Sequence, residues 1–219
     1  MEFRPSVLWE YRVFLLQGMA NTALLALTAQ ALALTLAVPT AVARLRGGAV
    51  TRRVAGAYVE FVRGTPALIQ LFWIFYCIPI FTGLDWSPLW GAIVALGMNV
   101  GAYDAEAFRA GIQSVHFGQV QAARALGLSA WSTFWAIILP QATRSVLPAL
   151  LNNFIGLLLY TSIASTIGVH ELTYAGGKLN TATFQSVVIF TGVAALYLVL
   201  SVAASAGVRR LERVQARRD

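Results

Sequence analysis

Several ionisable and polar residues of this chain lie inside long apolar runs. Glu60 and Arg63 are three residues apart, so they can share one face of a helix. Asn99, Tyr103 and Glu106 follow one another at steps of four and three, which also gives a single helical stripe. An ionisable group at the centre of a bilayer costs at least about 2.5 kcal/mol, so it normally faces protein or a cavity. These residues therefore suit a passage for a hydrated, charged or zwitterionic solute.

The same argument adds five candidate residues to this pathway, namely Thr65, Gln70, Asn153, Thr161 and Ser162. Thr65 precedes Pro66, which lacks a backbone donor and disfavours helix at the residue before it, so we expect a kink or a short unwound turn there. Asp104 falls on a different helix face from the stripe. Structural roles stay open as alternatives: an ion pair between Glu60 and Arg63, another between Glu106 and Arg109, and interhelical hydrogen bonds from Asn152 and Asn153.

The sequence offers little for catalysis or metal binding. A phosphate-binding loop needs a glycine-rich turn with a lysine, and the only lysine, Lys178, stands in Gly176-Gly177-Lys178-Leu179 without the rest of the motif. There is no G-x-S-x-G turn, and Cys77 is the only cysteine. In the topology derived below, His116 and His170 fall on opposite sides of the membrane. We therefore expect no catalytic residues, no metal site and no cofactor in this chain.

Composition indicates an integral membrane protein. Of 219 residues 58% are hydrophobic and only 11% are charged, with a mean hydropathy of +0.69, whereas soluble domains carry about 25% charged residues. The net charge is +7, but the arginines cluster beside apolar runs and form no continuous basic surface. This distribution argues against nucleic-acid binding and in favour of a topology signal.

About 20 apolar residues cross a bilayer as a helix. By this measure the chain is an all-α membrane protein, one transmembrane domain over residues 1–219, with five spans and no internal repeat. The predicted spans are about Val13–Val42, Val54–Phe81, Pro88–Ile112, Trp135–Tyr160 and Phe184–Val208. The segment Thr161–Thr183, rich in Gly, Ser and Thr, is predicted to be a partly re-entrant or surface loop and not a sixth span.

The arginines then predict the orientation. They concentrate in the first connection, near the third connection and in the C-terminal tail: Arg44, Arg46, Arg52, Arg53, Arg109, Arg124, Arg144, Arg209, Arg210, Arg213, Arg217 and Arg218. With five spans these clusters share one side, which the positive-inside bias makes cytoplasmic. The N-terminus is then outside, the C-terminus is inside, and the structured loop Ser114–Ala130 is cytoplasmic.

That loop carries a spaced motif. Gln121-Ala122-Ala123 is followed after three residues by Gly127, and nine residues later by Ile137, Leu139 and Pro140. In this motif the chain resembles the permease subunits of bacterial ABC importers for polar amino acids, the histidine/glutamine/arginine/glutamate type, whose loop reads E-A-A, three residues, G, nine residues, I-x-L-P. Three further runs share the resemblance, which covers nearly the whole chain: Phe61–Pro79, Tyr103–Val115 and Thr161–Leu172.

The resemblance implies the type I importer permease fold. It also implies a coupling helix at about Gln119–Leu128, whose small alanines seat in a groove of a separate ATPase and whose Gly127 ends it in a left-handed conformation. Pro140 would set the direction of the re-entering chain. The implied coupling residues are Gln121, Ala122, Ala123, Ala125, Leu126, Gly127, Leu139 and Pro140.

The resemblance further implies partners and a location. The partners are two ATPase subunits that hold ATP and Mg²⁺, a second permease subunit, identical or paralogous, and an external amino-acid binding protein. The location is the bacterial inner membrane. Two residues depart from the pattern, Gln121 in place of Glu and Leu159 in place of a frequent Lys.

Two questions stay open at the level of the sequence. Glu60 and Glu106 would suit a cationic amino acid, whereas Arg63 would suit an acidic one or any α-carboxylate, so the amino acid is undecided. A self-sufficient ion-coupled carrier or channel is the alternative function, although such carriers usually show paired repeats. An intramembrane enzyme would need a nucleophile and a base at one depth, which the two histidines do not provide.

Overall fold

A computed structural model describes residues 4–85 and 87–216, with only the backbone described from residue 208 onward. Within these ranges every regular element is helical. The long helices are α2 (Arg12–Arg46), α3 (Ala49–Arg63), α6 (Pro88–Gln113), α9 (Leu139–Tyr160) and α11 (Ser186–Ala216). The short elements are α1 (Ser6–Glu10), α4 (Ala67–Phe72), η1 (Trp73–Cys77), α5 (Ile78–Thr82), α7 (Phe117–Ala125), α8 (Ala130–Thr133), η2 (Phe134–Ile138), η3 (Thr161–Ile167) and α10 (Leu172–Thr183).

Three helical stretches of the described chain are long and apolar enough to cross a membrane: Arg12–Arg46, Ala130–Ile167 and Ser186–Gly207. A fourth is obtained if the bent pair of Ala49–Arg63 and Ala67–Thr82 counts as one span. The first, second, fourth and fifth predicted spans therefore all have helical counterparts. The helix for the fourth span is longer than predicted at both ends, because α8, η2, α9 and η3 follow one another without a break.

The third predicted span corresponds to α6, a 26-residue helix that is not among the stretches long and apolar enough to cross a membrane. Most of its residues from Gly91 to Ala105 are buried by neighbouring helices, including Asn99 and Asp104. α6 is thus an interior helix, and its polar groups have protein partners.

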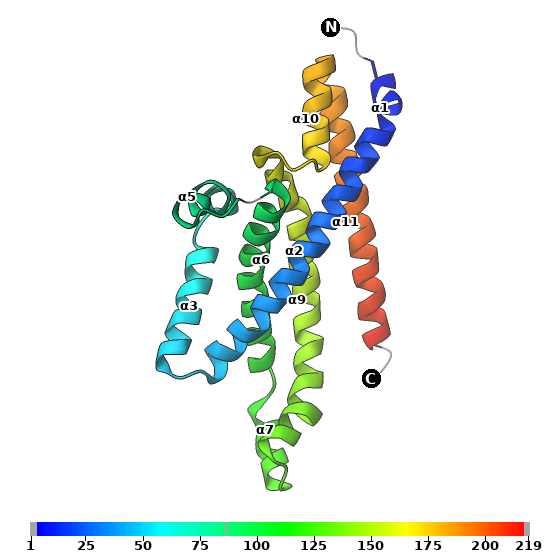
Figure 1. Ribbon diagram of the computed structural model, residues 1–219. Helices are drawn as coiled ribbons and strands as arrows, with labels where there is room; N and C mark the ends of the chain where they lie inside the picture. The colour runs from blue at the N-terminus through cyan, green and yellow to red at the C-terminus, as the bar shows by residue number, and fades with distance from the viewer. Residues whose placement is uncertain (1–3, 86, 217–219) are drawn as a thin grey trace.

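Small residues bring α2 and α6 into close contact. Ala26, Ala29, Ala33 and Ala37 of α2 recur at helical spacing and are fully buried. A Cβ atom at Gly101 of α6 would lie 3.1 Å from the carbonyl oxygen of Ala33. Alanine and glycine allow this approach because neither holds the two backbones apart. α6 also packs on α9 (Figure 1).

The second span is broken where the sequence predicts a kink. α3 ends at Arg63, Gly64 caps it, and Pro66 has extended backbone before α4 begins. The axis turns by 108° between α3 and the stretch from α4 to α5. Figure 1 shows α5 lying across the direction of α3 and joining the start of α6 through a short loop.

The segment Thr161–Thr183, predicted to be a partly re-entrant or surface loop and not a span, is mostly helical. The segment forms η3, a short connection that begins at Gly168, and the twelve-residue helix α10. Glu171 caps α10: its carboxylate accepts hydrogen bonds from the backbone of Thr173 at 2.9 Å and of Tyr174 at 2.7 Å, and from the Tyr197 hydroxyl at 2.6 Å. A buried carboxylate that is satisfied from three sides fixes this helix despite its glycines and threonines.

The two ends of the molecule differ. α7 and the turn between α2 and α3 lie toward one end, whereas α1 and α10 lie at the other (Figure 1). Of the C-terminal arginines, Arg209, Arg210 and Arg213 fall on the last turns of α11. Arg217 and Arg218 lie outside the described residues.

We expect Gly101→Leu to lower the free energy of unfolding by about 1–3 kcal/mol, as overpacking typically does. The leucine side chain would meet the backbone of Ala33, which cannot retreat unless α2 moves. Thermal unfolding of the purified protein in detergent measures the effect. Gly156 of α9 is the matched control, because a Cβ atom there would meet nothing within 4 Å. Equal losses at the two positions would contradict this account of the contact.

Candidate functional site

A cavity of about 420 Å³ opens between α2, α3 and α6, and we call it the charged cavity. It is lined by Arg44, Val59, Glu60, Arg63, Gly64, Tyr103 and Glu106. Four predicted pathway residues are among these: Glu60, Arg63, Tyr103 and Glu106. Gly64, at the break after Arg63, contributes only backbone to the wall. The bent second span and the stripe on α6 thus face one another across this space.

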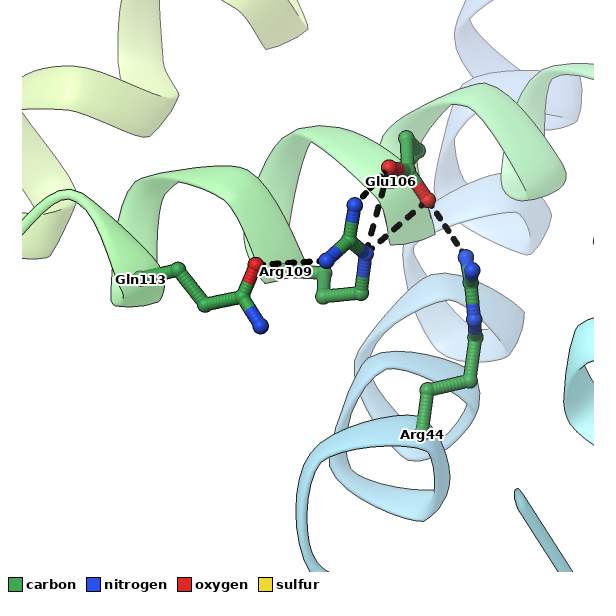
Figure 2. A network of polar contacts seen from close by, with 4 residues as sticks. All are labelled: Arg44, Glu106, Arg109 and Gln113. Atoms are coloured by element: carbon green, nitrogen blue, oxygen red, sulfur yellow. Dashed lines mark hydrogen bonds and ion pairs between the residues drawn. The ribbon is translucent and has the colours of Figure 1, made fainter.

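Glu106 is held on both sides by arginines (Figure 2). Arg44 of α2 forms an ion pair with one carboxylate oxygen, and Arg109 of α6 forms an ion pair with the other. The Arg109 Nε atom also lies 3.1 and 3.2 Å from the two oxygens, and Arg109 donates a further hydrogen bond to Gln113. The predicted alternative of a Glu106–Arg109 pair is therefore confirmed. The Arg44 contact was missed because its partners are 62 residues apart in sequence.

Glu60 and Arg63 do not pair with each other, contrary to the structural alternative. The Arg63 guanidinium lies over the Tyr103 ring, 5.2 Å from its centroid. Among the described residues neither the Glu60 nor the Arg63 side chain makes an ion pair. Both side chains are exposed on the wall of the charged cavity. Two opposite charges thus remain open toward the same space.

A second cavity of about 440 Å³ adjoins the first, and we call it the basic cavity. It shares Arg44 and Glu60 with the charged cavity and is completed by Arg52, Arg53, Gly56, Ala57, Arg109 and Gln113. From the sequence, Arg52 and Arg53 are predicted only to mark the orientation of the chain. The structure adds a second feature, since both side chains line a hollow next to the predicted pathway.

Three other predicted pathway residues stabilise the break in the second span. The Gln70 amide nitrogen donates to the Val62 carbonyl at 2.7 Å, to the Thr65 carbonyl at 3.1 Å and to the Thr65 hydroxyl at 2.7 Å. Asn99 of α6 donates to the Gln70 carbonyl oxygen at 3.0 Å. Thr65, Gln70 and Asn99 are absent from the walls of both the charged and the basic cavity. These residues satisfy backbone groups that the helix break leaves without partners.

The remaining three lie elsewhere. Asn153 of α9 donates to the buried Asp104 carboxylate at 2.8 Å, and Gln30 of α2 donates to its other oxygen at 2.7 Å. Thr161 and Ser162 donate to backbone carbonyls of the preceding helical turn. The prediction of interhelical bonding is confirmed for Asn153. Its partner Asp104, which was predicted to lie on a different face from the polar stripe, is the buried group that joins three helices.

The motif loop forms α7, which begins two residues before the predicted helix and ends three residues before its predicted end. His116 caps the start, since its Nδ1 atom accepts from the Gly118 backbone at 3.1 Å. At the other end Gly127 has a φ of +75°, its N–H donates to the Arg124 carbonyl, and the Leu128 N–H donates to that of Ala123. This is a Schellman motif, which needs a residue that tolerates positive φ.

The side chains of α7 face two ways. Ala123 is buried, at 1% exposure, whereas Gln121, Ala122, Ala125 and Leu126 are exposed, Leu126 at 80%. Leu139 and Pro140 occupy the first turn of α9, directly after the π-helical turn η2. The helical stretch from α8 to η3 continues through Pro140.

The model of the family described as "binding-protein-dependent transport system inner membrane component" matches residues 15–216. The chain belongs to this family. It is 36% identical over 214 residues to the glutamine transport system permease protein GlnP of Escherichia coli K12, covering 97% of this chain and 98% of the relative. It is 37% identical to the octopine transport system permease protein OccM of Rhizobium meliloti, over 92% and 85% of the two chains. The L-cystine transport system permease protein TcyB of Bacillus subtilis is 40% identical, over 83% and 80%.

Solved structures agree with this membership. The crystal structure of an amino acid ABC transporter with histidines superimposes with a TM-score of 0.92 and 31% identity, covering 97% of this chain and 99% of that one. The MetNI methionine ABC transporter, at 21% identity and a TM-score of 0.78, shares the fold. The predicted resemblance and the type I permease fold are confirmed. The ion-coupled alternative finds no support among these relatives.

Gln70→Met is expected to lower the free energy of unfolding of the permease by about 3 kcal/mol or more. The variant keeps the length of the side chain but leaves the Val62 and Thr65 carbonyls and the Asn99 amide without their partner, and unpaired buried polar groups cost about 1–3 kcal/mol each. Thermal unfolding in detergent measures it. Gln17→Met, at an exposed position of α2, serves as control and should unfold as the wild type does.

Proposed function

We propose that this permease is the transmembrane subunit of an ATP-driven importer that carries a polar or charged amino acid across the bacterial cytoplasmic membrane by alternating access. The charged cavity carries the proposal, because it places open charges of both signs inside a fold shared with amino-acid permeases. Relatives of the chain are named for the transport of glutamine, octopine and L-cystine, all of which are amino acids or amino-acid derivatives.

The proposed topology has five spans, with the N-terminus outside and the C-terminus in the cytoplasm. α2, the broken pair α3 to α5, α6, the helix from α8 to η3, and α11 form the spans. Two observations support this arrangement: the arginine-rich turn between α2 and α3 lies toward the same end as α7, and α1 lies toward the opposite end (Figure 1). The membrane-spanning part forms a single domain over residues 1–219.

Cysteine labelling tests this topology. With Cys77 replaced by serine, a cysteine at the exposed Arg124 should react with a membrane-impermeant maleimide only after the cells are opened. A cysteine at the exposed Lys178 of α10 should react in spheroplasts that are still intact. The reverse pattern, or labelling of both positions from one side, would exclude the proposed orientation.

We propose that α7 couples the permease to an ATPase dimer that binds ATP and Mg²⁺. Its exposed Ala122 and Ala125 leave room for close seating in a groove, and Leu126 adds an apolar contact. Closure of the two ATPase subunits would draw two copies of α7 together and tilt α6 and α9, between which α7 lies in the chain. The second copy belongs to another permease subunit, identical or paralogous.

An external binding protein would deliver the amino acid to the opposite end of the permease. We propose the outer segments 81–87 and Gly168–Asn180 as its docking surface; residue 86 lies outside the described part of the chain. Phe81 at 80% and Leu84 at 52% exposure offer apolar contacts on the first segment. α10 offers a rigid second segment, because Glu171 and Tyr197 anchor its start.

Gly127→Val tests the role of α7. A β-branched residue at positive φ is strained by about 1–3 kcal/mol, so the last turn of α7 should rearrange. In the reconstituted complex, transport and the ATP hydrolysis stimulated by the binding protein should both fall well below wild type. Gly127→Asn is the matched control and should retain most activity, because asparagine tolerates the left-handed region. Wild-type rates in the valine variant would refute the coupling role.

A further inference from the structure

The pairing state of the charged residues shows what kind of amino acid these cavities can accept. We infer that the charged and basic cavities select an α-amino acid with an acidic or amide side chain and reject cationic amino acids. This inference rests on the proposed function, and it decides a question that the sequence alone leaves open.

The first observation is the pair of open charges on α3. Glu60 and Arg63 line one cavity, carry opposite charges, and have no ion-pair partner among the described residues. The ring of Tyr103 steadies the Arg63 guanidinium through a cation–π contact at 5.2 Å. An α-amino acid carries a carboxylate and an ammonium group on one carbon. Its zwitterionic head therefore matches both charges at once, with the carboxylate on Arg63 and the ammonium on Glu60.

The second observation is that the Glu106 carboxylate is not free to bind a cationic ligand. Its two carboxylate oxygens are occupied by Arg44 and Arg109, which come from different helices (Figure 2). A lysine or arginine side chain of a ligand would have to displace one of these guanidinium groups. The carboxylate that the sequence suggests as a partner for a cationic amino acid is thus already neutralised.

The third observation concerns the space next to the head group. The two cavities together are lined by Arg44, Arg52, Arg53, Arg63 and Arg109 against only Glu60 and Glu106. Positive charge is therefore in excess, and most of the excess lines the basic cavity. A side chain that reaches from Glu60 into the basic cavity meets guanidinium donors and the Gln113 amide. Carboxylate or amide oxygens can accept from these donors, whereas a cationic group is repelled.

The dimensions permit such a ligand. Each cavity exceeds 400 Å³, and sites for small molecules typically measure about 300–1,000 Å³. Arg44 and Glu60 belong to both walls, so the two cavities adjoin along these residues. The head group and the side chain of one amino acid can therefore occupy the two spaces together.

Direct binding to the complete complex of permease and ATPase subunits in nanodiscs tests the inference. No external binding protein is added, so the affinities are those of the membrane site. We expect tritiated L-glutamate and L-glutamine to bind at least about tenfold more tightly than L-arginine and L-lysine, the effect of one charge-assisted contact. Equal or tighter binding of L-arginine in the wild-type complex would overturn the inference, and this comparison needs no variant.

Two variants extend the test to named residues. Arg63→Gln should weaken L-glutamine binding about ten- to hundredfold, because the α-carboxylate loses its partner. Arg109→Gln frees one side of Glu106, so it should shift the preference toward L-arginine by about tenfold, which a general loss of folding would not do. Arg12→Gln, at the outer end of α2 where Arg12 lies over the Trp9 ring, is the matched control and should bind as the wild type does.

The outcomes separate the inference from the proposed function. A wild-type complex whose ATP hydrolysis responds to binding protein and amino acid, but which binds L-arginine as well as L-glutamine, retains the proposed function and refutes the inference. If Arg109→Gln leaves the preference for L-glutamine over L-arginine unaltered, the role assigned to the ion pairs of Arg44 and Arg109 with Glu106 is also refuted. A complex that neither binds nor transports any amino acid fails the proposed function itself.

Discussion

A charge placed between apolar helices is stable only with a partner of opposite charge, with hydrogen bonds to every oxygen, or beside a hollow that admits water. The acidic residues of the permease interior differ in how they meet this constraint. Asp104 accepts from Gln30 and Asn153, Glu171 caps α10, and Glu106 sits between two arginines. Glu60 meets the constraint only by facing the charged cavity. A charge without a protein partner therefore marks where a ligand can act.

α6 links the buried charges to the proposed coupling helix α7. α6 holds Asp104 and Glu106 on two faces and presses against the alanines of α2 through Gly97 and Gly101. Three residues separate its end at Gln113 from the start of α7. A displacement of α7 would therefore reach the wall of the charged cavity through a single helix. Because Arg44 of α2 forms an ion pair with Glu106, α2 would follow the same movement.

Features encoded by a few neighbouring residues were predictable from the sequence. The break at Gly64-Thr65-Pro66 and the positive φ of Gly127 follow from local backbone chemistry, and the structure has both. Features that need distant partners were not predictable. α10 depends on Glu171, whose bonds to Thr22 and Tyr197 reach 149 residues back and 26 residues forward. A run with two glycines and several threonines favours a loop until those contacts are known.

The candidate pathway shows the same division. Polar residues inside apolar runs could be singled out from the sequence, but their type did not reveal whether each faces a cavity or another helix. Gln70 and Asn99 are as polar as any ligand group. Gln70, however, donates to the Val62 carbonyl before the break, and Asn99 donates to Gln70. Only the hydrogen-bond partners of each residue distinguish the two roles, and those partners depend on how α3, α6 and α9 pack.

The bonds at the break also limit how the permease can move. A bend of 108° beside a glycine and a proline has the composition of a hinge, but Gln70 bonds to Val62 before the break and to Thr65 within it, and Asn99 ties it to α6. Bending there would break several hydrogen bonds in a place with little water to replace them. The bent span would therefore move together with α6. In the proposed mechanism, opening and closing of the cavity would come from motion of these elements as one unit, which would leave the geometry of Glu60 and Arg63 intact.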